Sequence, residues 1–263
     1  MLRSIDSING YTITERNGEA VGQVYDFYFD DHTWTIRYLV VDTGVWLPGR
    51  KVLISPQALG EPEWGGGVSL PVNLTKEEIE NSPSVDVDRP VSRQSEAALS
   101  SHYGWPAYWN DVTFFDANAV GMPAETYVRS RQDAAEAEAA RPVTAEPQRE
   151  LVTDPDLRSI EEVTHYYIQA SDGDIGHVDD FVIDTANWTI QYMIIDTRNW
   201  WPGKRVLIAP TWIANISWEE SKVYVDLTRE TIKNAPEYDP TTPVNREYES
   251  RLYDYYGRPY YWP

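Results

Sequence analysis

Histidine and aspartate are the residues of this chain best suited to acid–base chemistry. The chain has four histidines, which are His32, His102, His165 and His177. Histidine titrates near neutral pH, which makes it the commonest general acid or base. The chain contains two similar copies of one pattern, and no histidine recurs at the equivalent position of the other copy. No two histidines have the spacing of metal ligands along the chain, so we expect neither a catalytic histidine nor a metal site.

Three aspartates do recur in both copies. The pairs are Asp26 with Asp180, Asp30 with Asp184, and Asp42 with Asp196. Two carboxylates held at a fixed separation can hydrolyse a glycosidic bond, so a hydrolase that uses Asp26 and Asp180 is one hypothesis. For the other two pairs, the simpler interpretation is a capped turn or an ion pair across a hairpin. Asp26 and Asp180 interrupt aromatic strands, where they are candidate binding residues that bond backbone inside the mouth of a barrel.

Tryptophan recurs at four equivalent places, and most of these side chains are expected in a core. The pairs are Trp34 with Trp188, Trp46 with Trp200, Trp64 with Trp218, and Trp109 with Trp262. Trp46 and Trp200 lie in a polar turn, so they are candidates for contact with the other copy or with a partner. Trp109 and Trp262 belong to aromatic tails, and we expect each tail to pack on the barrel of the opposite copy, at an interface between the copies.

Other catalytic machinery is absent from the sequence. The chain has no cysteine, which excludes disulfides, thiolate metal sites and a cysteine nucleophile. Gly65-Gly66-Gly67 lacks the Lys-Ser/Thr pair and the helix that follow a phosphate-binding loop. The sequence has no serine-centred nucleophile elbow. We therefore expect no enzymatic activity and no cofactor.

The elements that must position these side chains are short β-strands, and they occur twice. Residues 22–56 and 176–210 are identical at eighteen of thirty-five aligned positions. In each copy, an apolar run of strand length ends at Asp42 or Asp196, and a turn and a second short strand follow. The turns contain Pro48-Gly49 and Pro202-Gly203, and these residues together with the two aspartates form the structural signature of the repeat. Strands joined by short turns predict an antiparallel meander that closes into a small barrel.

Each copy continues beyond its barrel into short helices and an aromatic tail. Thr75 and Glu78 form a capping box, and Gly104 and Gly257 suit the left-handed end of a second helix. Between the copies the chain becomes rich in alanine, charge and proline, which is typical of a linker. We therefore predict a mainly β protein with short helices. It has a first copy at residues 1–109, a linker at 110–156 and a second copy at 157–263, with the copies related by a pseudo-two-fold axis.

The repeated pattern resembles the PRC-barrel family of small β-barrels. The resemblance is carried by residues 22–30, 37–42 and 47–56, and by the corresponding residues of the second copy. The family includes the barrel in the cytoplasmic part of the photosynthetic reaction centre H subunit and a barrel in a bacterial ribosome maturation factor. The resemblance implies two tandem barrels, and it implies a docking role because such barrels look like docking modules elsewhere.

The charge of the chain limits its partners. A formal net charge of −20 repels phosphate backbones and anionic lipid surfaces, which disfavours binding to nucleic acid or directly to a membrane. No apolar run reaches the roughly 18 residues of a membrane-spanning helix, and the N-terminus lacks the apolar core of a signal peptide. We expect a cytoplasmic protein without an integral membrane segment, whose membrane contact, if any, is peripheral and through a membrane protein.

Two functions are compatible with these features. The first is a non-enzymatic scaffold or adaptor, similar to the reaction centre H subunit, that binds an unidentified protein partner through barrel surfaces. The alternative is a sensor that holds a small molecule or an ion between the two copies by tryptophan and aspartate side chains. Assembly into a homodimer is compatible with either function.

Overall fold

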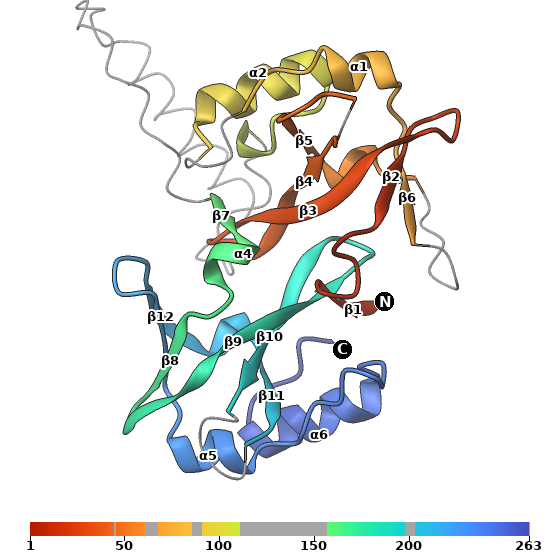
Figure 1. Ribbon diagram of the computed structural model, residues 1–263. Helices are drawn as coiled ribbons and strands as arrows, with labels where there is room; N and C mark the ends of the chain where they lie inside the picture. The colour runs from red at the N-terminus through yellow and green to blue at the C-terminus, as the bar shows by residue number, and fades with distance from the viewer. Residues whose placement is uncertain (45, 61–67, 86–90, 111–156, 198–202, 263) are drawn as a thin grey trace, which may run out of the picture. The chain divides into compact units, whose positions relative to one another are not determined.

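The structure is a computed structural model that describes residues 1–263 except 45, 61–67, 86–90, 111–156, 198–202 and 263 (Figure 1). The chain divides into two compact units. The larger unit joins Met1–Val91 to Asp154–Pro263, and the smaller unit is Ser92–Thr153. The larger unit is mainly β, with a curled half-barrel sheet and few short helices. This division differs from the sequence repeat, because the helix and the tail of the first copy fall in the smaller unit.

The predicted strands of both copies are present. The first copy contains β1 (Leu2–Ser4), β2 (Thr12–Thr14), β3 (Ala20–Asp30), β4 (Thr35–Asp42), β5 (Lys51–Ile54) and β6 (Ser69–Pro71). The second contains β7 (Leu157–Ser159), β8 (Tyr167–Ala170), β9 (Gly173–Asp184), β10 (Thr189–Asp196), β11 (Arg205–Ile208), β12 (Ile213–Ser217) and β13 (Lys222–Val225). β4 and β10 are buried along most of their length, in keeping with their continuous apolar runs.

The helices are short and are capped as the sequence predicts. The larger unit contains α1 (Lys76–Glu80), α4 (Ile160–Val163), α5 (Arg229–Asn234), α6 (Arg246–Tyr256) and the 3₁₀ turns η1 (Pro56–Ala58) and η3 (Pro210–Trp212). The smaller unit contains α2 (Arg93–Tyr103) and η2 (Tyr108–Asn110). The capping box of Thr75 and Glu78 is confirmed, and Gly104 and Gly257 end α2 and α6 in the left-handed conformation. Among the described residues, every helix falls short of the length or the hydrophobicity that crossing a bilayer requires.

All the described strands belong to one sheet that passes from one copy into the other. Its path runs β12-β13-β8-β9-β10-β4-β3-β2-β6, and the copies meet where β10 pairs with β4. At this junction the amide of Ile36 donates to the carbonyl of Trp188, and the amide of Ile190 donates to the carbonyl of Trp34. Both tryptophans have positive φ, 53° and 58°, which is rare for a bulky residue. In the described part of the chain, the strands of the two predicted barrels are thus hydrogen-bonded into a single sheet.

Two short strands cross to the opposite copy, and we call them the arms. The first arm is β1, which pairs with β9 of the second copy, and the second arm is β7, which pairs with β3 of the first copy. The pairings are equivalent, since Ser4 lies opposite Val182 and Ser159 lies opposite Tyr28. Each copy thus donates its first strand to the other copy.

The two copies also share a hydrophobic core. The ring of Trp188 stacks on Phe27 with centroids 6.5 Å apart, and Phe29 meets Phe181 at 6.1 Å. All four side chains are at most 9% exposed. Aromatic burial of this size stabilises each copy only when the other is present.

The exchange of arms predicts that neither copy folds alone. We expect fragments 1–110 and 154–263 to lack cooperative unfolding when separate, because each lacks an arm and half of the aromatic core. Mixed together, they should form a one-to-one complex that melts cooperatively, which circular dichroism and size-exclusion chromatography would measure. Two separate fragments that each melt cooperatively as monomers would show that the copies are independent domains.

Candidate functional site

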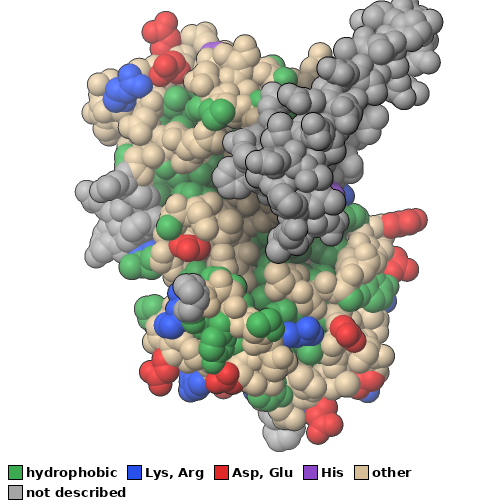
Figure 2. Space-filling view, turned by 180° about the vertical axis from the view of Figure 1, so that it is seen from behind, with side chains coloured by type: hydrophobic (Ala, Val, Ile, Leu, Met, Phe, Trp, Pro, Cys, Tyr) green, Lys and Arg blue, Asp and Glu red, His purple; other side chains and the backbone are tan. Residues whose placement is uncertain are grey.

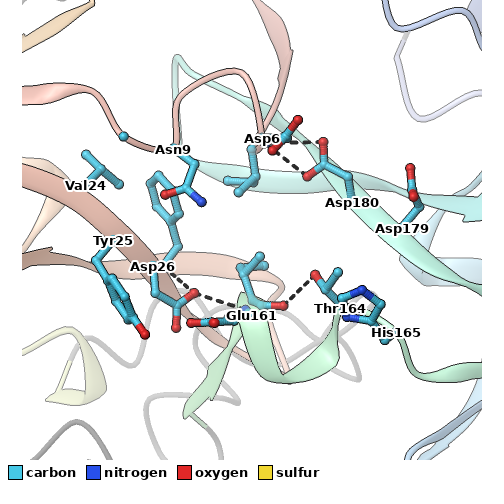
Figure 3. Close-up of a pocket in the computed structure, with 14 residues that line it drawn as sticks. Asp6, Asn9, Val24, Tyr25, Asp26, Glu161, Thr164, His165, Asp179 and Asp180 are labelled. Atoms are coloured by element: carbon cyan, nitrogen blue, oxygen red, sulfur yellow. Dashed lines mark hydrogen bonds between the residues drawn. The ribbon is translucent and has the colours of Figure 1, made fainter.

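A cavity of about 500 Å³ lies between the two copies, inside the larger unit (Figure 3). Its walls come from β3, from β9, from α4 and from the segment that follows β1. The lining residues are Ile5, Asp6, Asn9, Gly10, Val24, Tyr25, Asp26, Phe27, Ile160, Glu161, Thr164, His165, Asp179 and Asp180. Its volume lies within the range of small-ligand sites. The cavity brings together Asp26 and Asp180, two of the four candidate binding residues.

The lining of this cavity is strongly acidic. Five of the fourteen lining residues carry a carboxyl group, and none is lysine or arginine. The carboxyl groups belong to Asp6, Asp26, Glu161, Asp179 and Asp180. A concave wall of one charge sign with apolar surroundings concentrates the electrostatic potential and attracts ions of the opposite sign. The arrangement therefore favours a cation or a proton.

Asp26 holds the arm of the second copy. Its side chain is 6% exposed and accepts a hydrogen bond from the Ser159 hydroxyl at 2.6 Å. It also accepts from the backbone amides of Glu161 at 3.1 Å and Phe27 at 2.7 Å. Burial raises the pKa of Asp26 to about 6, although these hydrogen bonds oppose the shift. The carboxyl group of Asp26 thus changes its charge near neutral pH.

Asp180 makes the equivalent contacts with the first arm. Its carboxyl oxygens accept from the amide of Asp6, at 3.2 and 3.3 Å, and from the amide of Phe181 at 2.7 Å. Burial raises the pKa of Asp180 to about 7, against the opposing effect of these amides and the Ser4 hydroxyl. Figure 3 shows Asp26 beside Glu161 and Asp180 beside Asp6 around the cavity. Asp26 and Asp180 thus each cap the arm that arrives from the other copy.

Of the two tryptophans predicted to contact the other copy or a partner, Trp46 contacts its own copy. Its ring is half-buried, its Nε1 donates to the carbonyl of Val21 at 2.8 Å, and Lys76 lies 5.1 Å from the ring centroid. Trp46 thus closes its loop onto the first copy and stays outside the cavity lining. Trp200 lies outside the described residues.

Of the Asp42 and Asp196 pair, Asp42 takes part in a turn and Asp196 is buried at the end of β10. Asp42 is exposed and accepts from the amide of Gly44 at 2.8 Å, whereas Asp196 is 2% exposed. In the signature turn, Pro48 is exposed and Gly49 has a φ of 74°, which suits glycine. Gly203 is half-buried. Pro202, the remaining signature residue, lies outside the described residues.

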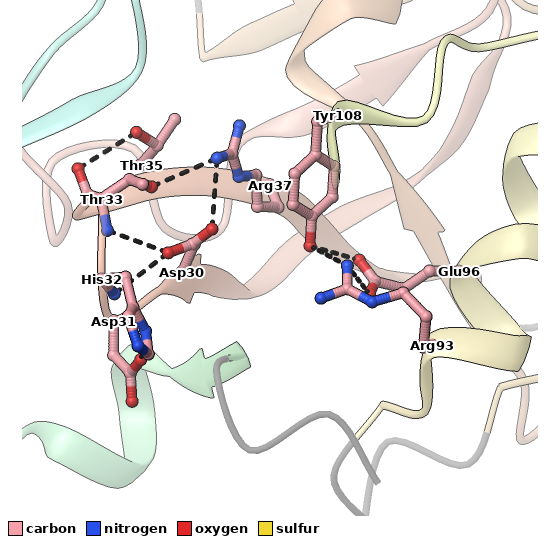
Figure 4. Close-up of polar contacts among 9 residues, drawn as sticks. All are labelled: Asp30, Asp31, His32, Thr33, Thr35, Arg37, Arg93, Glu96 and Tyr108. Carbon is pink, nitrogen blue, oxygen red and sulfur yellow. Dashed lines mark hydrogen bonds and ion pairs between the residues drawn. The ribbon is translucent and has the colours of Figure 1, made fainter. Parts of the chain in front are cut away.

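Asp30 and Asp184 also bond their own turns. The carboxylate of Asp30 accepts from the amides of His32 and Thr33 and pairs with Arg37 at 3.2 Å (Figure 4). Asp184 accepts from the amide of Ala186 and pairs with the N-terminal ammonium at 2.8 Å. The interpretation of these aspartates as turn caps is therefore confirmed.

The aromatic tail of the second copy packs within that copy. Trp262 lies against Tyr260, with centroids 4.7 Å apart, and 4.1 Å from the guanidinium of Arg246. The prediction that this tail packs on the opposite copy is therefore wrong for Trp262, because its ring lies against α6 of its own copy. In the smaller unit, Arg93 lies 4.8 Å from the ring of Trp109.

A buried glutamate anchors the tail in each copy. Glu249 accepts from the hydroxyls of Tyr192 at 2.7 Å and Tyr261 at 2.8 Å, and burial raises the pKa of Tyr192 above its usual value. In the smaller unit, Glu96 accepts from the Tyr108 hydroxyl at 2.7 Å and pairs with Arg93 at 2.9 Å (Figure 4). These polar contacts account for the tails as structural elements.

The structure also gathers three residues that the sequence interpretation did not connect. His177, Asp179 and Asp196 place their ligand atoms within 4.8 Å of one another. His177 and Asp179 lie two residues apart on β9, with a β-bulge at Asp179, and Asp196 pairs with His177 across the hairpin. The signal was the i, i+2 spacing on one strand combined with the register of the next strand. A search for histidine pairs could not find it, because two of the three residues are aspartates.

Comparison with known proteins identifies the N-terminal part of the chain. The family model of the PRC-barrel domain matches residues 2–64, which include β1 to β5. The resemblance read from the sequence is thus confirmed there. A search of curated proteins finds none that matches the chain.

The buried carboxyl of Asp26 predicts a pH-dependent stability. Because its pKa of about 6 when folded lies above the 3.8 of an exposed aspartate, its stabilising contribution is complete below pH 3.8 and is lost as pH rises through 6. Asp26→Asn introduces a neutral group of similar shape that, like the protonated carboxyl, offers one carbonyl acceptor and a donor. We expect it to raise the free energy of unfolding at about pH 8 by roughly 1–3 kcal/mol, and by much less at about pH 5.

Urea denaturation at the two pH values measures this difference. Asp42→Asn is the matched control, since Asp42 is exposed and should show no comparable difference. An Asp26→Asn variant that is equally destabilised at both pH values would show that the charged hydrogen bonds outweigh the cost of burial.

Proposed function

We propose that this chain, with its PRC-barrel domain at residues 2–64, is a non-enzymatic sensor that binds a small cationic ligand between its two copies. The copies act in this proposal as tandem barrels related by a pseudo-two-fold axis. The observation that carries the proposal is the cavity of about 500 Å³ with five carboxyl groups and neither lysine nor arginine in its lining.

The electrostatics of the cavity favour a cation over a neutral ligand. Burial raises the pKa values of Asp26 and Asp180 to about 6 and 7, so their charged forms lack compensation inside the fold. A cation that enters the cavity supplies that compensation, and it competes with the protons that these groups otherwise take up.

The location of the cavity links ligand binding to the association of the copies. Asp6 and Glu161 lie just beyond the arms, and Asp26 and Asp180 hold the arms. A cation placed among these groups contacts both copies at once. Binding should therefore stabilise the association of the two copies through their exchanged arms. A sensor needs such a response to its ligand.

The contacts of the two aspartates support a non-enzymatic role. Each carboxyl group already accepts hydrogen bonds from two backbone amides, which fixes it as a cap for an arm. A hydrolytic pair would need one carboxyl as an acid or nucleophile and the other as its distinct counterpart. Here the two groups have equivalent surroundings.

A pair of ligands that differ in charge tests the sensor. We expect 1,4-diaminobutane at millimolar concentration to raise the melting temperature, and 1,4-butanediol, its neutral counterpart, to leave it unchanged. Glu161→Gln removes one exposed carboxylate of the lining and should weaken the effect of the diamine roughly twofold to fivefold. Differential scanning fluorimetry at constant ionic strength measures both effects.

The control variant is Glu77→Gln, which removes an exposed carboxylate of α1 and leaves the cavity unchanged. A diamine effect that both variants reduce equally would reflect the net charge of −20 and would contradict a cavity site.

A second candidate function is the protein adaptor, which a cluster of exposed tyrosines favours. Tyr255, Tyr260 and Tyr261 are 39%, 44% and 50% exposed within seven residues of the chain. Exposed tyrosine is enriched at protein interfaces because it buries a large area at low entropic cost. Figure 2 shows one face of the molecule on which apolar patches alternate with acidic and basic side chains.

The adaptor function can be tested by crosslinking a variant in which Tyr255 and Tyr260 are replaced. We expect a partner that crosslinks to the wild-type protein to be lost from a Tyr255→Ser, Tyr260→Ser variant that still unfolds cooperatively. Tyr167→Ser is the control, because Tyr167 is 57% exposed on β8 of the same copy. Capture of the same partner by wild-type and doubly substituted protein would rule out this surface.

A further inference from the structure

His177, Asp179 and Asp196 form a ligand set on one face of the second copy. The side chains of His177 and Asp179 approach each other on β9 at a β-bulge, where Val178 and Asp180 pair with consecutive residues of β10 and Asp179 is the inserted residue. Asp196 lies opposite His177 in the β9–β10 pairing. The ligand atoms of all three lie within 4.8 Å of one another. We propose that these residues bind a divalent transition-metal ion of the zinc type at the edge of the acidic cavity.

This inference deepens the proposed function and rests on it, since it names an ion and the residues that hold it. Asp179 belongs both to the ligand set and to the cavity lining, so the two sites are continuous.

The donor set selects the class of ion. One imidazole nitrogen and two carboxylate oxygens suit Zn²⁺ and its neighbours in the first transition row, whereas Mg²⁺ and Ca²⁺ prefer oxygen alone. Three protein ligands leave at least one coordination position for water or a bound molecule. Asp196 is 2% exposed, whereas His177 and Asp179 are half-buried. One ligand of the set is therefore shielded from solvent, and the other two lie where solvent can reach them.

A second imidazole stands beside this set. The ring of His165 lies parallel to that of His177, with centroids 6.1 Å apart and an interplanar angle of 10°. His165 also lines the cavity (Figure 3). The cavity thus offers both room for the remaining coordination positions and a further nitrogen donor close to the ion.

Arg205 forms an ion pair with this group. Its Nε lies 2.8 Å from one carboxylate oxygen of Asp179, which leaves the second oxygen for the ion. Carboxylate ligands of metals are commonly held by such a partner, which fixes their orientation. With two carboxylates and one guanidinium, the group still has a net negative charge that attracts a cation.

The first copy lacks this donor set and supplies its own control. The positions of His177 and Asp179 are occupied there by Gln23 and Tyr25. Lys51, the equivalent of Arg205, lies 3.3 Å from the centroid of the Tyr25 ring. A cation–π contact thus replaces the ion pair in the first copy, so the same backbone accepts a substitution at these positions.

The test is calorimetric titration of the full-length, chelator-treated protein with ZnCl₂, with MgCl₂ as the comparison. We expect one Zn²⁺ per chain and no comparable binding of Mg²⁺. His177→Gln, which installs the residue of the first copy, should weaken Zn²⁺ binding at least about 100-fold. His32→Gln is the control, since its side chain is 72% exposed and outside the set, and it should bind as the wild type does.

The possible failures are distinguishable. No Zn²⁺ binding by the wild type, or equal binding by His177→Gln, would overturn the metal site. The response to 1,4-diaminobutane is measured on the same proteins. If that response persists in His177→Gln, the cation sensor stands without the metal, and if it is absent from the wild type while Zn²⁺ still binds, only the organic cation is excluded.

Discussion

The reciprocal capping of the two arms is the interaction on which the rest of the structure depends. Each arm is only three residues long, and a backbone hydrogen bond contributes about 0.5–1.5 kcal/mol net, so strand pairing alone would hold it weakly. A buried carboxyl group at the end of each arm adds hydrogen bonds to the amides that follow it. The aromatic core beneath completes the attachment. The cavity exists because these contacts bring β3 and β9 to face each other.

The same contacts explain why the cavity is acidic. A carboxylate is a good acceptor for several backbone amides, but burial makes its charge costly, as the raised pKa values of Asp26 and Asp180 show. The aspartate at this position of each copy, Asp26 or Asp180, thus both caps an arm and makes the cavity acidic. The second copy adds His177 and Asp179 where the first has glutamine and tyrosine, so two similar halves differ in the chemistry that they offer.

Local features of the fold could be predicted from the sequence, and the pairing between copies could not. Strands, turns and the capping box of Thr75 depend on neighbouring residues, and each is present. The arms read Leu-Arg-Ser in both copies, so the pattern cannot decide whether β1 pairs within its own copy or with the other. The packing of the Trp262 tail could not be predicted for a related reason. Its apolar composition indicates that the tail is buried but does not indicate which copy it packs against. The proximity of His177 and Asp196 could not be predicted, because it depends on the register between β9 and β10.

The exchange of arms also has a consequence for the order in which a ribosome makes this chain. The first arm is made well before the strand that it pairs with, since Asp184 of β9 lies 183 residues beyond Met1. At 5–20 residues per second, the arm waits on the order of 10–40 s for its strand. Until then the edge of β3 and the carboxyl of Asp26 also lack their partners from β7. A nascent chain with an unpaired strand edge can associate with other chains, so the second copy, once it is made, protects the first.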